Sequence, residues 1–226
     1  RGEEILVGTE QGHLLRVAGG APQPVDAFER APGRERWYTP WGAPPDVRSL
    51  AEVDGAVLVN VHVGGIVRSV DLEVWETTVD IDYDVHQVIP VPGRPGWALG
   101  AAAVGLLVST DGGRSWAVET AGLHATYCRA AAATDAWVVV SASAGHRGDR
   151  AALYRRPLDG SAPLERCRDG LAEWFASNID TGCLVAAGST VAAGTAEGQV
   201  FQSDDDGLTW ATVASGLPRV RALALL

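Results

Sequence analysis

The sequence contains no lysine and no methionine, so all 18 of its basic residues are arginines. They stand against 28 aspartates and glutamates, which gives a formal net charge of −10 at pH 7. An acidic chain without runs of basic residues is poorly matched to a polyanion. We therefore expect neither nucleic acid nor an anionic membrane among its partners.

Cysteine is also scarce. Cys128, Cys167 and Cys183 are odd in number and have no CxxC spacing, so neither a disulfide framework nor a metal-binding motif is predicted. Cys128 and Cys183 fall on expected inner strands and should pack as small apolar residues. This cysteine usage favours a cytoplasmic location. A processed secreted chain would look the same, because its signal peptide would be gone.

Long hydrophobic runs are absent as well. The longest mostly apolar stretch, 97–108, is interrupted by glycine and is shorter than the ~20 residues that span a bilayer as a helix. No segment has the periodicity of a long amphipathic helix. No linker or change in composition divides the 226 residues. The sequence therefore predicts one all-β domain over residues 1–226.

What the sequence does contain is a repeated octapeptide. Residues 109–116 are STDGGRSW and residues 203–210 are SDDDGLTW, so both fit S-x-D-x-G-x-[ST]-W. The Asp can accept hydrogen bonds from the backbone of its own turn, and the Gly can adopt positive φ. The Trp gives the hairpin an apolar anchor. The predicted structural residues are Ser109, Asp111, Gly113, Trp116, Ser203, Asp205, Gly207 and Trp210.

This motif resembles the Asp box of the BNR-repeat family, found in sialidases, sortilin-type receptors and photosystem-assembly propellers. The resemblance implies a β-propeller in which each box joins the third and fourth strands of a blade, away from the ligand-binding mouth. Sialidase-like chemistry would also require three arginines for a substrate carboxylate, for which Arg48, Arg129 and Arg221 are candidates. The stand-ins for the nucleophile pair and the acid would be Tyr127 or Tyr83, Glu173 and Asp84.

The chain also departs from these families. Sialidases of this type have six blades and carry a Phe/Tyr-Arg-Ile-Pro segment near their start, which this sequence lacks. The photosystem-assembly propellers are similar in the style of their repeats, but they have more blades and act as scaffolds that bind partners. The resemblance therefore implies the fold more firmly than it implies sialidase activity.

The repeats predict how many blades there are. Ser109 and Ser203 are 94 residues apart, or twice 47, which fits the ~40–50 residues of a four-stranded blade. Five β-rich cores around a glycine turn recur, at 5–17, 57–68, 98–108, 137–154 and 191–202. Five expected inner strands begin at 47–50, 85–88, 128–131, 179–182 and 220–223.

These counts predict a five-bladed β-propeller with Asp-box hairpins. Its blades are expected at 220–226 plus 1–45, 46–83, 84–125, 126–176 and 177–219. The strand at 220–226 should complete the blade begun by 4–17, so that the N- and C-terminal strands close the ring. Three of the boxes are expected to be degenerate. Among them, 69–75 keeps its Ser, Asp and Trp but is one residue shorter.

Loops at one mouth of a propeller carry its ligand sites. One position recurs just after the leading apolar residue of each inner strand, and it is occupied by Arg48, His86, Arg129, Asp180 and Arg221. Arginine is suited to bidentate capture of a carboxylate or phosphate, so this ring predicts an anion-binding mouth. The alternative is that Asp180 and the arginines neutralise one another in a wet channel.

Histidines and aromatic residues give two further sets of candidates. The histidines expected on the same face are His13, His62, His86, His124 and His146. No pair has HxH or HxxxH spacing, so we predict no cofactor and keep a metal ion as the lesser alternative. Trp37, Tyr38 and Trp41 lie among proline and glycine, which predicts a stiff exposed loop for a sugar or flat ring. The alternative is that they cover the mouth as a lid.

Two hypotheses from different classes follow. The first is a propeller that binds a small polar ligand, anionic or glycan-like, at the channel mouth. The second is a glycoside hydrolase or lyase whose candidate catalytic residues are Asp84, Tyr127, Glu173 and Asp180. A scaffold that binds a protein partner is a further alternative. A carboxyl group with a raised pKa beside the ligand would favour the enzyme. The spacing shows no catalytic constellation, so binding is favoured.

Overall fold

The computed structural model describes residues 4–225 and is almost entirely β-structure. Within this range the strands form five antiparallel sheets, consistent with a five-bladed propeller. The first sheet has three strands, β1 (Ile5–Gly8), β2 (Leu14–Val17) and β3 (Gln23–Pro24). Each of the others has four strands, which pair in the order of the sequence.

The bounds of the remaining strands follow in chain order. The second sheet contains β4 (Val47–Val53), β5 (Ala56–Val61), β6 (Gly65–Ser69) and β7 (Glu76–Val79). The third contains β8 (Val85–Pro90), β9 (Ala98–Ala102), β10 (Gly105–Ser109) and β11 (Ala117–Glu119). The fourth contains β12 (Tyr127–Ala133), β13 (Trp137–Ser143), β14 (Ala152–Pro157) and β15 (Glu165–Arg166). The fifth contains β16 (Leu184–Ala187), β17 (Thr190–Gly194), β18 (Val200–Ser203) and β19 (Ala211–Ala214).

Helical structure in residues 4–225 is limited to short 3-10 turns in the connections. They are η1 (Glu10–Gly12), η2 (Phe28–Arg30), η3 (Arg34–Arg36) and η4 (Ile81–Tyr83). No helix in this described range is long and apolar enough to cross a membrane.

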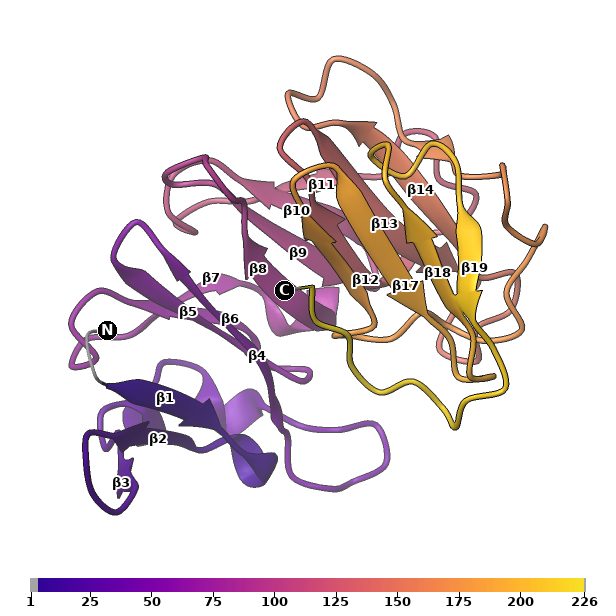
Figure 1. Cartoon of the computed structure of the whole chain (residues 1–226). Coiled ribbons are helices and arrows are strands. Elements are labelled where there is room, and N and C mark those ends of the chain that lie inside the picture. The colour runs from indigo at the N-terminus through magenta and orange to yellow at the C-terminus, as the bar shows by residue number, and fades with distance from the viewer. Residues whose placement is uncertain (1–3, 226) are drawn as a thin grey trace.

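Hydrophobic packing joins the sheets in sequence. Four clusters of buried residues each lie between two consecutive sheets. Between the second and third sheets, for example, Leu58 and Ile66 pack with Val88 and Leu107. Burying each such side chain contributes about 1.5–3 kcal/mol. Figure 1 shows the sheets following one another from the first at lower left to the fifth at right. In residues 4–225 no such cluster joins the fifth sheet to the first.

Both Asp boxes form the predicted turns, between β10 and β11 and between β18 and β19. Asp111 Oδ1 accepts backbone N–H bonds from Arg114 and Ser115 at 3.0 Å each, and Oδ2 accepts the Ser115 hydroxyl at 2.6 Å. The hydroxyl bond from Ser115, supported by these backbone bonds, lowers the pKa of Asp111 to about 2. In the second box the hydroxyl and N–H of Thr209 act in the same way and lower the pKa of Asp205 to about 2.

The segment 69–75, predicted to be a degenerate box because it is one residue shorter, still forms a box-like turn. Asp71 Oδ1 accepts the backbone N–H groups of Glu73 at 2.8 Å and Val74 at 2.9 Å. The Trp75 ring N–H donates to the Leu72 carbonyl at 3.2 Å, as the other box tryptophans donate to the carbonyl of the box glycine. Leu72 takes the left-handed conformation (φ 68°) that glycine supplies in the other two boxes. The shorter sequence therefore keeps the backbone and tryptophan hydrogen bonds of the box, without the hydroxyl bond to the second Asp oxygen that Ser115 and Thr209 make.

The predicted closing strand at 220–226 is also not observed. Residues 220–225 form no strand and do not pair with β1, and Leu226 lies outside the described residues. The Leu223 N–H donates instead to the Gly182 carbonyl at 2.9 Å, so this segment lies along the inner side of the fifth sheet. Figure 1 shows it running back from β19 toward the middle of the molecule. Within residues 4–225, the chain ends therefore do not share a sheet.

The start of this segment nevertheless resembles the start of an inner strand. Val220 N–H donates to Thr195 O at 3.1 Å, just as Val47 N–H donates to Thr9 O at 3.0 Å where β4 begins. The local sequence therefore predicts correctly how the segment begins, with the same backbone hydrogen bond that starts β4. Its pairing fails because β1, the strand it should join, lies in a sheet that does not pack against the fifth.

Candidate functional site

Three inner strands carry a β-bulge at the position predicted to face the ligand. The pairing of β4 with β5 shifts between Val47 and Ser49, so Arg48 is the extra residue. The same shift occurs around His86 in β8, and between Cys128 and Ala131 in β12, which contains Arg129. A bulge bends its strand and re-aims a side chain. The recurring sequence position thus corresponds to a recurring irregularity of the backbone.

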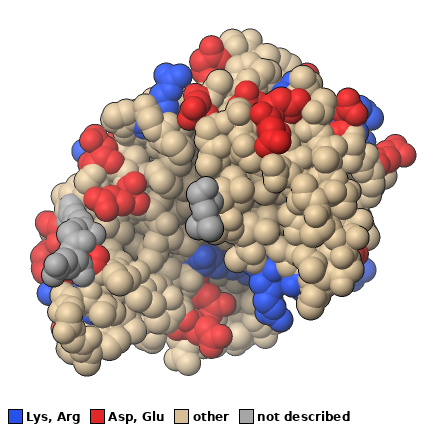
Figure 2. Space-filling model, viewed as in Figure 1, with Lys and Arg blue, Asp and Glu red and all other residues tan. Residues whose placement is uncertain are grey.

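A cavity of about 440 Å³ lies at this end of the inner strands. Its lining residues are Arg48, Arg129, Asp180, Thr181, Cys183, Arg219, Val220 and Arg221. Four of the five predicted ring positions therefore meet here, and His86 does not line the cavity. Figure 2 shows basic atoms at the floor and lower rim of a hollow between the two halves of the molecule.

Asp180 reaches the cavity from a turn. The predicted inner strand at 179–182 does not form, because β16 begins only at Leu184 and Cys183 N–H donates to Asp180 O at 2.9 Å. The next residue, Thr181, places its hydroxyl 3.0 Å from the carbonyl oxygens of both His86 and Arg129. This hydroxyl can donate to either carbonyl, and it fixes the turn against two neighbouring sheets.

Asp180 also pairs with two arginines. Its Oδ1 lies 3.2 Å from Arg129 Nη1, and its Oδ2 lies 2.5 Å from Arg219 Nη2. Arg219 is not among the residues predicted from the sequence. It stands two residues before Arg221, and alternate residues of an extended segment share a side, which is the pattern that would have found it.

Arg48 has no such counter-ion. It is half-buried, and no acidic side chain in residues 4–225 forms an ion pair with it. Burial lowers the pKa of Arg48, the neighbouring Arg129 guanidinium lowers it further, and Asp84 offsets part of the effect. Arg129 Nε is buried and has no hydrogen-bond partner. Both arginines line the cavity, but the unpartnered Nε of Arg129 is not accessible from it.

His86 lies beside this cavity and is fully buried. Its Nδ1 is 2.7 Å from the Cys128 carbonyl, which can only accept, so Nδ1 carries a proton. Its Nε2 is 3.4 Å from Asp84 Oδ2, and Asp84 Oδ1 lies 3.8 Å from His62 Nε2. Burial and the nearby Arg48 lower the pKa of His62 to about 4, so this histidine is neutral at pH 7.

Asp84 is ionised at neutral pH. Burial acts to raise its pKa, but the hydrogen bond and charge of His86, with His62 and Arg48, outweigh the burial and hold the pKa below its ordinary value. A general acid in a glycosidase needs the opposite shift. Tyr127 makes a tilted contact with His86, 4.7 Å between ring centroids, and interacts electrostatically with both Asp84 and Asp180. Glu173 is exposed and does not line the cavity.

The five histidines do not converge. Within the described chain, 4–225, no group of three or more His, Cys, Asp or Glu residues could hold a metal ion. His62 and His86 share Asp84. The others have separate surroundings: His13 contacts Glu29 at 2.9 Å, His124 contacts the Tyr154 hydroxyl at 2.7 Å, and His146 is exposed.

The aromatic loop is only partly exposed. Trp37 is 8% exposed and packs on Phe28 with ring centroids 5.7 Å apart, so the prediction of an exposed platform is wrong for this residue. Tyr38 and Trp41 are 50% and 63% exposed, as predicted. The ring of Trp41 lies 4.9 Å from that of His62. An exposed aromatic surface therefore adjoins the His62–Asp84 pair.

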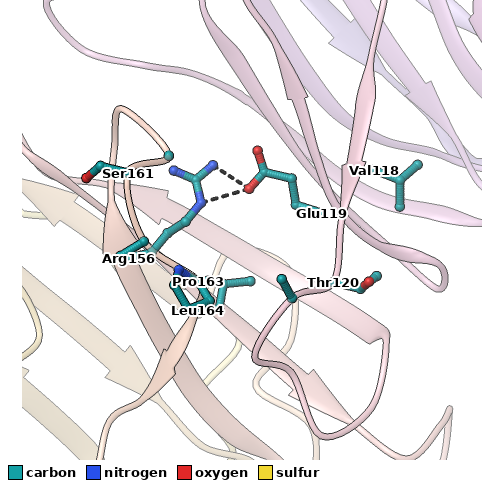
Figure 3. Close-up of a pocket in the computed structure, with 10 residues that line it drawn as sticks. Val118, Glu119, Thr120, Arg156, Ser161, Pro163 and Leu164 are labelled. Atoms are coloured by element: carbon teal, nitrogen blue, oxygen red, sulfur yellow. Dashed lines mark hydrogen bonds and ion pairs between the residues drawn. The ribbon is translucent and has the colours of Figure 1, made fainter.

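A second cavity, of about 500 Å³, lies on the outer side between the third and fourth sheets. Figure 3 shows Glu119 of β11 and Arg156 of β14 pointing toward each other there. Glu119 Oε2 lies 2.8 Å from Arg156 Nε and 2.6 Å from Nη2. Arg156 also donates to the Leu158 carbonyl at 3.1 Å. Since its charges are already satisfied, this cavity is the weaker candidate for an anion.

No protein-family model matches the sequence, and no curated protein matches it. Among solved structures, the GH74 xyloglucanase from Xanthomonas campestris is similar with a TM-score of 0.65 and 14% identity, over 94% of this chain and 37% of that one. PorZ, a surface component of the type-IX secretion system of Porphyromonas gingivalis, gives 0.64 and 13%, over 97% and 30%. YCF48 bound to D1 peptide gives 0.58 and 14%, over 95% and 64%.

The chain thus spans less than two thirds of the length of each of these proteins. All three have β-propeller-type folds. At such low identity the similarity shows the fold alone. The chain is therefore a β-propeller-type protein of five described sheets.

Proposed function

We propose that this chain binds a small anionic ligand in the cavity lined by Arg48, Arg129, Arg219 and Arg221. The observation that carries this proposal is the half-buried guanidinium of Arg48, which has no ion-pair partner in residues 4–225. A charge removed from water is costly unless it is paired. A carboxylate, sulfate or phosphate group of a ligand would supply the missing partner.

The donors around Arg48 support the same conclusion. Arg129 and Arg221 also line the cavity, and a guanidinium can bind an oxyanion through two parallel N–H bonds. Each hydrogen bond to a charged group contributes about 1.5–3 kcal/mol. The volume of about 440 Å³ falls within the range of small-molecule sites. A sugar or other ring that carries the anionic group could rest on the exposed Trp41.

A hydrolase is the second candidate, because the solved structures of similar fold include a GH74 xyloglucanase. Asp180 lines the cavity, and Asp84 lies beside Arg48 and His86. The lowered pKa of Asp84 makes it a poor proton donor, and Asp180 is already paired with two arginines. A site in which Asp84 and Asp180 have partners while Arg48 and Arg221 form no ion pair in residues 4–225 favours binding over hydrolysis.

The test is calorimetric titration of the protein with inorganic phosphate, followed by a panel of aryl glycosides that includes sialosides. We expect phosphate to bind to the unchanged protein, and we expect Arg48→Met to raise the Kd for phosphate about tenfold or more. Arg94→Met is the matched control, because Arg94 is exposed in the turn between β8 and β9 and does not line the cavity. Hydrolysis of any glycoside, abolished by Asp180→Asn, would favour the enzyme instead.

A further inference from the structure

The cavity already contains an anion of its own. The Asp180 carboxylate lies between Arg129 of the fourth sheet and Arg219 of the C-terminal segment, one oxygen toward each guanidinium. Oδ1 makes no hydrogen bond despite its ion pair at 3.2 Å, so its contact with Arg129 is poorly aligned. An incoming anion could therefore replace Asp180 on Arg129 with better geometry.

The charges around the cavity do not balance. Four arginines and Asp180 line it, which gives +4 − 1 = +3. Asp84 and Asp46, which both attract Arg48, reduce this to +3 − 2 = +1. His62 is neutral at pH 7. With Asp180 in place the excess therefore corresponds to one negative charge, and an anion that displaces Asp180 meets an excess of +1 + 1 = +2.

We infer that the cavity selects dianions, such as a phosphate ester or a dicarboxylate, an inference that rests on the proposed anion-binding function. Asp180 imposes this selectivity because its carboxylate competes with the ligand for Arg129. A monoanion that displaces Asp180 from Arg129 exchanges one unit charge for another and gains little. A dianion gains a second unit of attraction to Arg48 and Arg221, which have no ion pair in residues 4–225.

Asp180 is not needed to hold the C-terminal segment in place. Arg219 is 58% exposed, and an exposed ion pair contributes little to stability. The segment is held instead by the backbone bonds from Val220 N–H to Thr195 O and from Leu223 N–H to Gly182 O. Replacing the carboxylate should therefore change the ligand site without unfolding the chain.

The experiment compares Asp180→Asn with the unchanged protein at pH 8, where phosphate is a dianion. Phosphate, succinate and acetate are titrated separately by calorimetry. We expect the unchanged protein to bind phosphate at least about tenfold more tightly than acetate. In the variant, acetate should bind at least about fivefold more tightly than before, so that the preference for the dianion narrows. If succinate binds more tightly than phosphate, the ligand is a dicarboxylate. If phosphate binds more tightly than succinate, the ligand carries a phosphate group.

Asp135→Asn is the control, since Asp135 is exposed in the turn after β12 and makes the same charge change away from the cavity. If Asp180→Asn weakens every anion, Asp180 organises the site and the inference is overturned, although anion binding stands. If the unchanged protein binds no anion, the proposed function itself fails. Should Asp180→Asn not fold, Asp180→Ser removes the same charge with a smaller side chain and provides the same comparison.

Discussion

Replacing Arg48 with methionine separates a binding role from a structural one. Arg48 is the extra residue of the bulge in β4 and forms no ion pair in the described chain. Methionine keeps the length of the side chain and removes a charge that burial disfavours. Asp84 loses the attraction of Arg48 but keeps its contacts with His86 and His62. The free energy of unfolding without ligand should stay the same or rise by about 1 kcal/mol.

The same substitution should weaken ligand binding, although it leaves the stability of the ligand-free protein unchanged or slightly higher. Loss of one charged hydrogen-bond donor costs about 1.5–3 kcal/mol of binding free energy, which weakens phosphate binding about 10- to 150-fold. For a chain of this size, 1 kcal/mol corresponds to about 2–4 °C in Tm. Thermal melts with and without phosphate therefore measure both effects at once. Arg48→Met should melt at or slightly above the Tm of the unchanged protein without phosphate, and the rise in Tm that phosphate causes should largely disappear.

Two results would refute this reasoning. A loss of more than about 2 kcal/mol in the absence of ligand would mean that Arg48 is a structural partner rather than a free cation. Unchanged phosphate affinity in Arg48→Met would mean that the anion binds elsewhere. The Arg94→Met control should leave both the Tm without ligand and the phosphate affinity unchanged, because it removes the same charge from the exposed turn after β8.

Three further predictions concern the fold. Asp111→Asn or Asp205→Asn should lower the free energy of unfolding by about 1 kcal/mol at pH 7. Because folding lowers the pKa of each carboxyl group from 3.8 to about 2, its contribution to stability is full above about pH 4 and fades as the pH falls through 2. The difference in Tm between the variant and the unchanged protein should therefore narrow between about pH 4 and about pH 2, and a constant difference would contradict this prediction. Gly170→Ala should cost roughly 2 kcal/mol or more in urea unfolding, because its φ is 77° and a Cβ would collide with the Trp210 carbonyl; a neutral result would show that this turn can move. Arg156→Met should cost about 3 kcal/mol by the same measurement, since it leaves Glu119 unpaired, and adding Glu119→Gln should recover part of that loss.

Features set by local chemistry could be predicted from the sequence. The Asp-box turns depend on one Asp, one Gly and one Trp at fixed spacing, so they were found without knowledge of the tertiary structure. Three of the four cavity arginines, Arg48, Arg129 and Arg221, could be predicted because each follows the leading apolar residue of an expected inner strand, whereas Arg219 does not occupy that position. Even so, the sequence did not show that a bulge re-aims them.

Features set by distant partners could not be predicted. Trp37 stands in a run of proline and glycine typical of an exposed loop, yet it is buried by Phe28 and lies against the Arg34 guanidinium, 4.9 Å from its ring. The segment from Val220 has the sequence of an inner strand. Whether it pairs depends on where the first sheet lies, which its own residues do not determine.

The most direct measurement is anomalous diffraction from a crystal soaked in tungstate, a heavy dianion shaped like sulfate. If the cavity binds anions, the strongest peak will lie within hydrogen-bond distance of the Arg48 and Arg129 guanidinium groups. A peak found only beside Arg156 in the outer cavity, or no peak near Arg48 at saturating tungstate, would contradict the proposal.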